Sequence, residues 1–280
     1  MKVSIRDEKF LSNLDLDRIK SYLISKGWQK LAKDEGKPVV AWILTVQDSE
    51  VRNIELLVNQ NSSFSMNYVC NMLEVLENVE GRSQLDIVSD IRHFYADIFR
   101  FHINSLESHS VEGGNGFTLD TTIQILQYLK DSFCWAASSV AASDLSSERK
   151  IEKSRVSNYI NCLQFEQSIS EQGETFTIVS PLQKTSIETL GYKSEAEFDE
   201  PFERLAAKKV VYLLKEFSPE NGVLSHGDSV VHCGDDFHGT FARLREVIGN
   251  RKFSLSVRWS PAIYSPHADK IEQLVIGIKQ

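Results

Sequence analysis

One segment organises the predicted fold: Thr118-Leu-Asp-Thr-Thr-Ile-Gln-Ile-Leu-Gln-Tyr-Leu-Lys-Asp-Ser-Phe-Cys-Trp135, continued by alanine, serine and valine to Ser143. Its apolar residues recur at steps of three and four, which is the spacing of one helical stripe. The stripe consists of Ile123, Leu126, Leu129 or Lys130, Phe133, Ala137 and Val140. Thr118 or Asp120 can cap the helix start, because a short oxygen-bearing side chain accepts an otherwise unpaired backbone N–H. We therefore predict a long buried helix with one mixed α/β unit before it and another after it.

The composition is that of an ordinary globular protein. The chain has 280 residues, of which 41% are hydrophobic and 25% charged, so it is long enough for two modest domains with substantial cores. Its formal net charge of −8 argues against a surface that binds nucleic acid or anionic lipid over its whole extent. A local basic face remains compatible with that charge.

The cysteines and the amino terminus predict a cytoplasmic protein. Cys70, Cys134, Cys162 and Cys233 are far apart and form no C-x-x-C pair, which favours reduced thiols. The amino-terminal residues show no signal-peptide pattern, and no apolar run approaches the ~18 residues that a membrane span requires. We therefore expect no membrane partner. There is also no nucleotide-binding fingerprint, so we expect no cofactor.

Residues 1–112 predict an N-terminal α-β-β-β-α-α-β unit. A helix is predicted over 15–25, and Gly27 follows it, where a left-handed C-cap residue is expected. Further predicted elements are strands at 28–32, 39–46 and 53–58, helices at 68–79 and from Ser83 onward, and a strand over 97–103.

The front of this unit resembles a known small fold. Residues 14–79 look like the α-β-β-β-α unit of double-stranded-RNA-binding domains and HicA-type toxins. The phrase Tyr22-Leu-Ile-Ser-Lys-Gly-Trp28 is similar to the corner between the first helix and first strand of the toxin family. The resemblance covers about a quarter of the chain and implies a fold.

The resemblance implies no catalytic residue. The toxin family places its nuclease histidine in the turn between its first strands, and the turn at 34–38 has none, since the first histidine is His93. The predicted second helix also ends with Glu74, Glu77 and Glu80 instead of the basic residues expected for RNA binding. A packed structural or partner-binding unit is the favoured interpretation.

The rest of the chain predicts a connection and a second unit. Residues 113–155 are interpreted as the connecting helix and a charged linker, and residues 156–280 as a C-terminal α+β unit with a hairpin and packed helices. The hairpin turns at Gly173, and a strand over 253–259 alternates between apolar and polar residues. The predicted fold class is α+β, with two mixed α/β units that have small antiparallel sheets and are joined by a long buried helix.

One polar cluster suggests a metal site. Between residues 226 and 238, histidines, a cysteine and aspartates gather, and the candidate ligands are His232, Asp236 and His238. The spacing matches neither H-E-x-x-H nor a zinc finger. The competing interpretation is a helix start that is rich in acids, where carboxylates meet the positive end of the helix dipole.

A second cluster is basic. Five residues within sixteen are positively charged and opposed only by Glu246: Arg243, Arg245, Arg251, Lys252 and Arg258. They suggest contact with phosphate in nucleic acid or with an acidic partner. A solvated basic face is the competing interpretation.

No catalytic set converges in the sequence, so a non-enzymatic role is the leading hypothesis. The phrases at 21–28, 80–84 and 256–261 resemble uncharacterised bacterial proteins of multi-gene phage-defence loci. We therefore expect a cytosolic subunit or adaptor of a bacterial multi-protein system, acting through protein–protein interaction. The alternatives are a nucleic-acid-binding protein that uses the face around Arg243 to Arg258, and a metal-dependent hydrolase at His232, Asp236 and His238.

Overall fold

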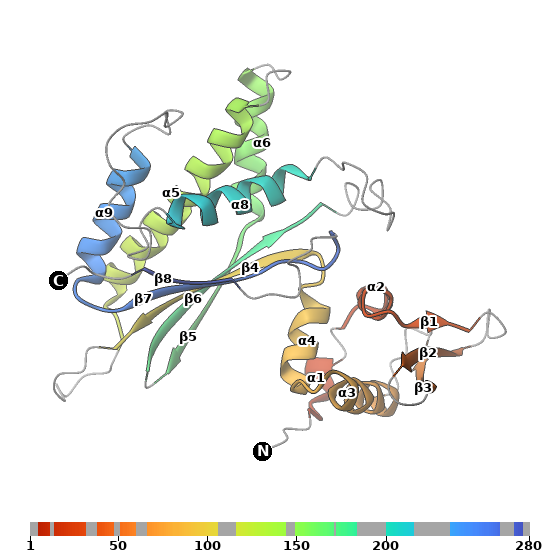
Figure 1. Ribbon diagram of the computed structural model, residues 1–280. Helices are drawn as coiled ribbons and strands as arrows, with labels where there is room; N and C mark the ends of the chain where they lie inside the picture. Colours follow the sequence, from red (N-terminus) through yellow and green to blue (C-terminus); the bar gives the residue numbers. More distant parts are fainter. Residues whose placement is uncertain are drawn as a thin grey trace. The chain divides into compact units, whose positions relative to one another are not determined.

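A computed structural model (Figure 1) shows an α+β fold, as predicted. The structure describes residues 5–11, 14–31, 38–47, 51–59, 66–105, 116–143, 149–170, 172–183, 200–215, 236–263 and 272–276. The chain forms two compact units, Met1–Phe94 with Pro261–Ile263, and Tyr95–Ser260 with Tyr264–Gln280. Each unit has its own antiparallel sheet.

The first unit has three strands and four described helices. In chain order its elements are α1 (Glu8–Leu11), α2 (Leu16–Ser25), β1 (Gln29–Lys30), β2 (Val39–Gln47), β3 (Val51–Asn59), α3 (Met66–Glu80) and α4 (Gln84–Arg92). The strands pair in the order β1-β2-β3. Asp15 caps α2 by accepting the Asp17 N–H at 2.9 Å, and Gly27 follows that helix with a φ of 82°. The predicted α-β-β-β-α order is therefore present from α2 to α3.

The second unit carries a five-stranded sheet. Its elements are β4 (Ala96–Asn104), α5 (Leu119–Ser143), α6 (Arg149–Cys162), β5 (Gln164–Ser170), β6 (Gly173–Pro181), α8 (Phe202–Lys215), α9 (Asp236–Ile248), β7 (Phe253–Arg258) and β8 (Glu272–Ile276). The strand order is β5-β6-β4-β7-β8, and all four pairings are antiparallel. The helices of the second unit lie on one side of this sheet (Figure 1).

The core of the second unit lies between the sheet and this helix layer. Phe99 and Phe101 of β4 are fully buried, and the Phe99 ring meets Phe133 of α5 edge-on at 5.0 Å. Small residues, including Ala137 of α5 and Ala207 of α8, have no exposed surface and allow close packing of helices. Burial of these side chains is the main driving force for this arrangement.

Helix α5 confirms the predicted helix but presents a rotated stripe. Thr118 accepts the Thr121 N–H at 3.2 Å, so the predicted cap is present. Leu129, Phe133 and Ala137 are buried as predicted, whereas Ile123 is 55% exposed. The buried line begins at Ile125 and proceeds in steps of four, and Ile125 lies about 200° around the helix from Ile123. Helix α5 belongs to the second unit.

The compact units divide at a different point from the segments read in the sequence. Strand β4, which was placed in the segment 1–112, is the central strand of the second sheet, between β6 and β7. Part of the charged segment that was read as a linker forms the start of α6. A strand is assigned to a unit by its hydrogen-bonded neighbours, and β4 finds both of them at distant positions in the chain.

Candidate functional site

A buried ion pair lies at the start of β4. The Asp97 carboxylate accepts hydrogen bonds from Arg204 of α8, with Oδ1 2.9 Å from Nη2 and Oδ2 3.0 Å from Nε. The Ser260 N–H also donates to Asp97 Oδ1 at 2.8 Å, and Arg204 Nη2 donates to the Ser260 carbonyl at 3.0 Å. Neither charged side chain has exposed surface. The pair thus joins the central strand, a covering helix and the chain that follows β7.

The environment of this pair changes its electrostatics. Burial raises the pKa of Asp97 to about 6, while the Arg204 charge and the hydrogen bonds from Ser260 and Arg204 act in the opposite direction. The Arg204 guanidinium also lies 5.2 Å from the centre of the Trp259 ring, a cation–π distance. Because neither charge is exposed to solvent, the pair is part of the packed interior of the second unit.

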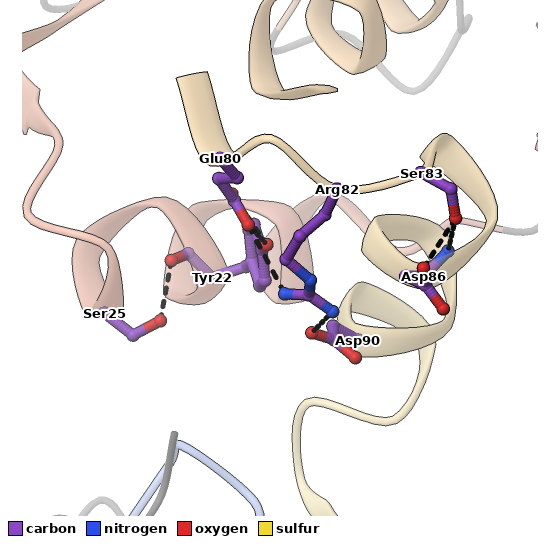
Figure 2. Close-up of polar contacts among 7 residues, drawn as sticks. All are labelled: Tyr22, Ser25, Glu80, Arg82, Ser83, Asp86 and Asp90. Carbon is purple, nitrogen blue, oxygen red and sulfur yellow. Dashed lines mark hydrogen bonds and ion pairs between the residues drawn. The ribbon is translucent and has the colours of Figure 1, made fainter. Parts of the chain in front are cut away.

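A second polar network links α2, α3 and α4 of the first unit (Figure 2). The Tyr22 hydroxyl lies 2.8 and 2.7 Å from the two carboxylate oxygens of Glu80, at the end of α3. Arg82 bridges that carboxylate, at 3.4 Å, to Asp90 of α4, at 2.7 Å. Ser83 caps α4 by accepting the Asp86 N–H at 3.2 Å, as predicted.

This network has a structural role in the described geometry. Glu80 and Asp90 are only 11% and 12% exposed, and each carboxylate has a charged partner in Arg82. Tyr22 is itself fully buried on α2. The arrangement therefore fixes α2, α3 and α4 relative to one another, with its acids already engaged by the protein's own donors.

Strand β5 is the exposed edge of the large sheet. All seven of its residues are solvent-exposed, whereas the neighbouring β6 is mostly buried. Two of them are large and apolar: Phe165 is 44% exposed and Ile169 is 65% exposed. One edge of β5 is paired with β6 and the other has no strand beside it in the described structure. Within the described residues, no strand pairs with the backbone N–H and C=O groups along that edge, and two apolar side chains lie beside them.

Contacts to β6 pre-position the side chains of β5 that lie on the helix side. The Phe165 ring stacks on Phe176 at 6.2 Å, and Gln167 Nε2 donates to Glu174 Oε2 at 2.7 Å. Glu174 is only 2% exposed, and its other oxygen accepts the Phe117 N–H. Contacts to buried residues of β6 thus hold Phe165 and Gln167 of the exposed strand in place.

The opposite face of the same sheet carries polar side chains beside the buried Ile98 and Val179. Arg100 and His102 of β4 point away from the helix layer, and His102 Nδ1 lies 2.9 Å from the Thr175 hydroxyl of β6. Arg258 lies on this face too, because it pairs with Ile98 two positions before Arg100. These three side chains are only half-buried, and they lie on the face of the sheet opposite the described helices of the second unit.

The five basic residues suggested by the sequence do not gather on one surface. Arg243 is exposed on α9 and Lys252 is exposed in the turn after it, whereas Arg258 lies on the opposite side of the sheet from α9. The Arg251 guanidinium lies 4.0 Å from the centre of the Phe117 ring and is half-buried. Arg245 is also half-buried.

The suggested metal ligands lie largely outside the described structure. His232 precedes the described start of α9, and only the backbone is described for Asp236 and His238 in the first turn of that helix. Within the described ranges, no group of three or more His, Cys, Asp or Glu side chains is placed to hold a metal ion.

Sequence reasoning missed both the buried pair and the exposed edge. Asp97 and Arg204 are 107 positions apart, and a lone acid at a strand start or a lone arginine in a helix gives no signal. Strand β5 was predicted as a strand, but strand order is not visible in a sequence. No part of the described chain forms a helix that is long and apolar enough to cross a bilayer. No family model, curated protein or solved structure matches this chain.

Proposed function

We propose that this protein acts as an interaction subunit that binds a strand of another polypeptide along the exposed edge of β5. The observation that carries the proposal is that all seven β5 residues are exposed at a sheet edge, with Phe165 and Ile169 on one side. Adding a strand to such an edge satisfies its unpaired N–H and C=O groups, and the neighbouring side chains supply specificity.

The sequence of β5 has few of the features that usually prevent such pairing. Protein edges are commonly protected by lysine, proline, a bulge or very short length. Strand β5 has seven residues, contains neither lysine nor proline, and keeps an uninterrupted register with β6 from Gln164 to Ser170. By contrast, β3 at the edge of the small sheet exposes Arg52 and Glu55.

The side chains of β5 define the chemistry of the partner strand. Phe165 and Ile169 lie on the helix side, so a partner strand with apolar residues at alternate positions can cover them. Glu166 is the only charged residue of β5 and lies on the other side, with Ser168. We expect a partner with one apolar and one polar face, recognised mainly through its backbone.

The test compares two lysine substitutions in the full chain. Ile169→Lys places a charge on the β5 edge, and Leu85→Lys is the control, because Leu85 is also about half exposed but lies on α4 of the other unit. Tagged protein is recovered from its native host with its companions, and amide hydrogen exchange is measured over 164–170 in the free and bound chain. We expect companions and protection with the wild type and with Leu85→Lys. Retention of both by Ile169→Lys would refute the proposal.

Nucleic-acid binding is a second proposal, favoured by the exposure of two basic side chains, Arg243 on α9 and Lys252 four residues after that helix. Phosphate contacts make such binding weaken steeply with salt. If this proposal holds, a shift assay detects binding that Arg243→Glu with Lys252→Glu abolishes. A null result at low salt would remove it.

A further inference from the structure

The edge strand β5 is complementary to itself, and this identifies the partner. We propose that β5 pairs antiparallel with β5 of a second copy of this chain, so that two five-stranded sheets join into one continuous sheet. This inference rests on the proposed function, because it requires β5 to be an interaction edge. It goes further by naming the occupant as the same polypeptide, related by a two-fold axis.

The antiparallel register centred on Gln167 pairs apolar residues with apolar residues and polar residues with polar residues. It places Phe165 opposite Ile169 of the second copy, Glu166 opposite Ser168, and Gln167 opposite itself. Apolar side chains therefore meet apolar side chains on the helix side, where Phe165 and Ile169 are 44% and 65% exposed. Like charges directly opposite each other would destabilise the pair of strands, and this register contains no such pair.

Other two-fold registers are poorer. A centre at Glu166 puts that carboxylate opposite its own copy and places Phe165 opposite Gln167. A centre at Ser168 leaves Gln164 and Phe165 without an opposite residue in β5 and puts Ile169 opposite Gln167. Only the centre at Gln167 uses the whole strand and covers both apolar side chains, so the sequence of β5 favours one arrangement.

A two-fold axis perpendicular to the sheet satisfies the geometry. It makes the two β5 strands antiparallel and keeps both helix layers on the same side, so side chains that lie opposite each other share a face. Gln167 uses one amide N–H for Glu174, and its second N–H and its oxygen are suited to the amide of the other Gln167. The contact is isologous and closes at two copies, because both β5 edges are consumed.

The first measurement is the mass of the full chain in solution as a function of concentration, by light scattering or sedimentation. We expect a dimer in equilibrium with monomer. Ile169→Lys shifts the equilibrium toward monomer by about tenfold or more, since each dimer loses two apolar contacts and gains two edge lysines. Leu85→Lys leaves it unchanged. Thermal unfolding verifies that each variant is folded.

The second measurement tests the register at Ser168, which is exposed and lies opposite Glu166 of the other copy. Ser168→Lys creates two opposite-charge pairs in each dimer, whereas Ser168→Glu creates two like-charge pairs. We expect the lysine variant to associate several-fold more tightly than the glutamate variant. Equal association, or the reverse order, would overturn the register.

Cysteine pairs give an independent test. The background carries Cys162→Ser, which removes an exposed thiol. Glu166→Cys protein, Ser168→Cys protein and an equal mixture of the two are each brought to association equilibrium and then oxidised. We expect cross-linking chiefly in the mixture, because identical positions are offset by two residues along the paired strands and exceed disulfide reach. Cross-linking of each variant with itself, and not in the mixture, would contradict the proposed pairing.

The outcomes separate this inference from the proposed function. If the chain is monomeric at every concentration but Ile169→Lys still loses its companions and the protection over 164–170, the partner strand belongs to another protein and only the self-pairing is wrong. If Ile169→Lys loses neither companions nor association, β5 is no interaction edge and both proposals fail.

Discussion

Strands β4 and β5 lie on either side of β6, and the same residue types on them have opposite environments. Phe99 and Phe165 flank Ile178 of β6, yet Phe99 has no exposed surface while Phe165 is 44% exposed. Ile103 and Ile169 flank Glu174, and their exposed fractions are 1% and 65%. The alternation in the sequence is alike; the number of neighbouring strands and the helix cover differ.

This difference in exposure means that β4 contributes mainly to the folding stability of the chain, whereas β5 can contribute to association with another strand. Burial of apolar surface contributes roughly 25 cal/mol per Å², and the β4 side chains obtain it when the chain folds. The β5 side chains keep much of their surface in water, so that contribution is available when another strand binds. Matched substitutions at the two pairs of positions should therefore affect different equilibria.

The largest contrast is expected from lysine at the two isoleucines. Ile103→Lys places an unpaired charge in the core and should lower the free energy of unfolding by about 4 kcal/mol or more. Ile169→Lys should change it by no more than about 0.5 kcal/mol. Chemical denaturation measures both. Comparable losses at the two positions would mean that β5 is covered within the single chain.

Alanine at the two phenylalanines gives the next contrast. Phe99→Ala removes a ring that contacts Phe133 and Trp259 and should cost about 3–5 kcal/mol of unfolding free energy. Phe165→Ala loses mainly its stacking on Phe176 and should cost about 1 kcal/mol or less. Measurement at a concentration where the chain is monomeric excludes the contribution of association. A cost at Phe165 equal to that at Phe99 would contradict the comparison.

The acids of the two strands should differ in pH dependence. Arg204→Met removes the charge that lowers the pKa of Asp97, so that pKa rises further above its wild-type value of about 6. Below that pH, Asp97 is protonated in both folded proteins; above it, only the wild-type carboxylate ionises readily. The destabilisation by Arg204→Met should therefore grow with pH, to about 3 kcal/mol near about pH 8.

Denaturation of the wild type and Arg204→Met between about pH 5 and about pH 8 measures this effect. The matched control is Glu166→Gln on β5, where the carboxylate is solvated and the unfolding free energy should change little at any pH. A pH-independent cost for Arg204→Met would mean that Asp97 is not the group that titrates.

Local patterns in the sequence predicted most of the elements. Thr118, Gly27 and Ser83 marked helix ends correctly because caps depend on residues within one turn. Gly173 marked the hairpin, where a Cβ would lie 2.1 Å from the Ile103 carbonyl oxygen, so only glycine fits at its φ of 143°.

Features that depend on distant contacts were beyond the sequence. The rotated stripe of α5 arises because Ile123 and Ile125 are both apolar, and only the packing of helices and sheet selects Ile125. The pair Asp97 and Arg204, and the edge position of β5, follow from strand order. The basic cluster was contiguous in sequence, but alternation along β7 puts Arg258 on the far side of the sheet.

The smallest effect is expected from salt, and it distinguishes the two proposed functions. Pairing of β5 with itself brings no charges of either sign opposite each other, since Glu166 faces Ser168. Its association constant should therefore vary by less than about threefold between about 50 mM and about 500 mM salt, because little Coulomb energy is available for screening. Binding through Arg243 and Lys252 to phosphate would weaken by orders of magnitude over the same range. Sedimentation of the full chain across this series gives the first dependence, and a shift assay with duplex and single-stranded oligonucleotides gives the second. A steep salt dependence of self-association would show that charged surfaces, and not the edge of β5, hold the two copies together.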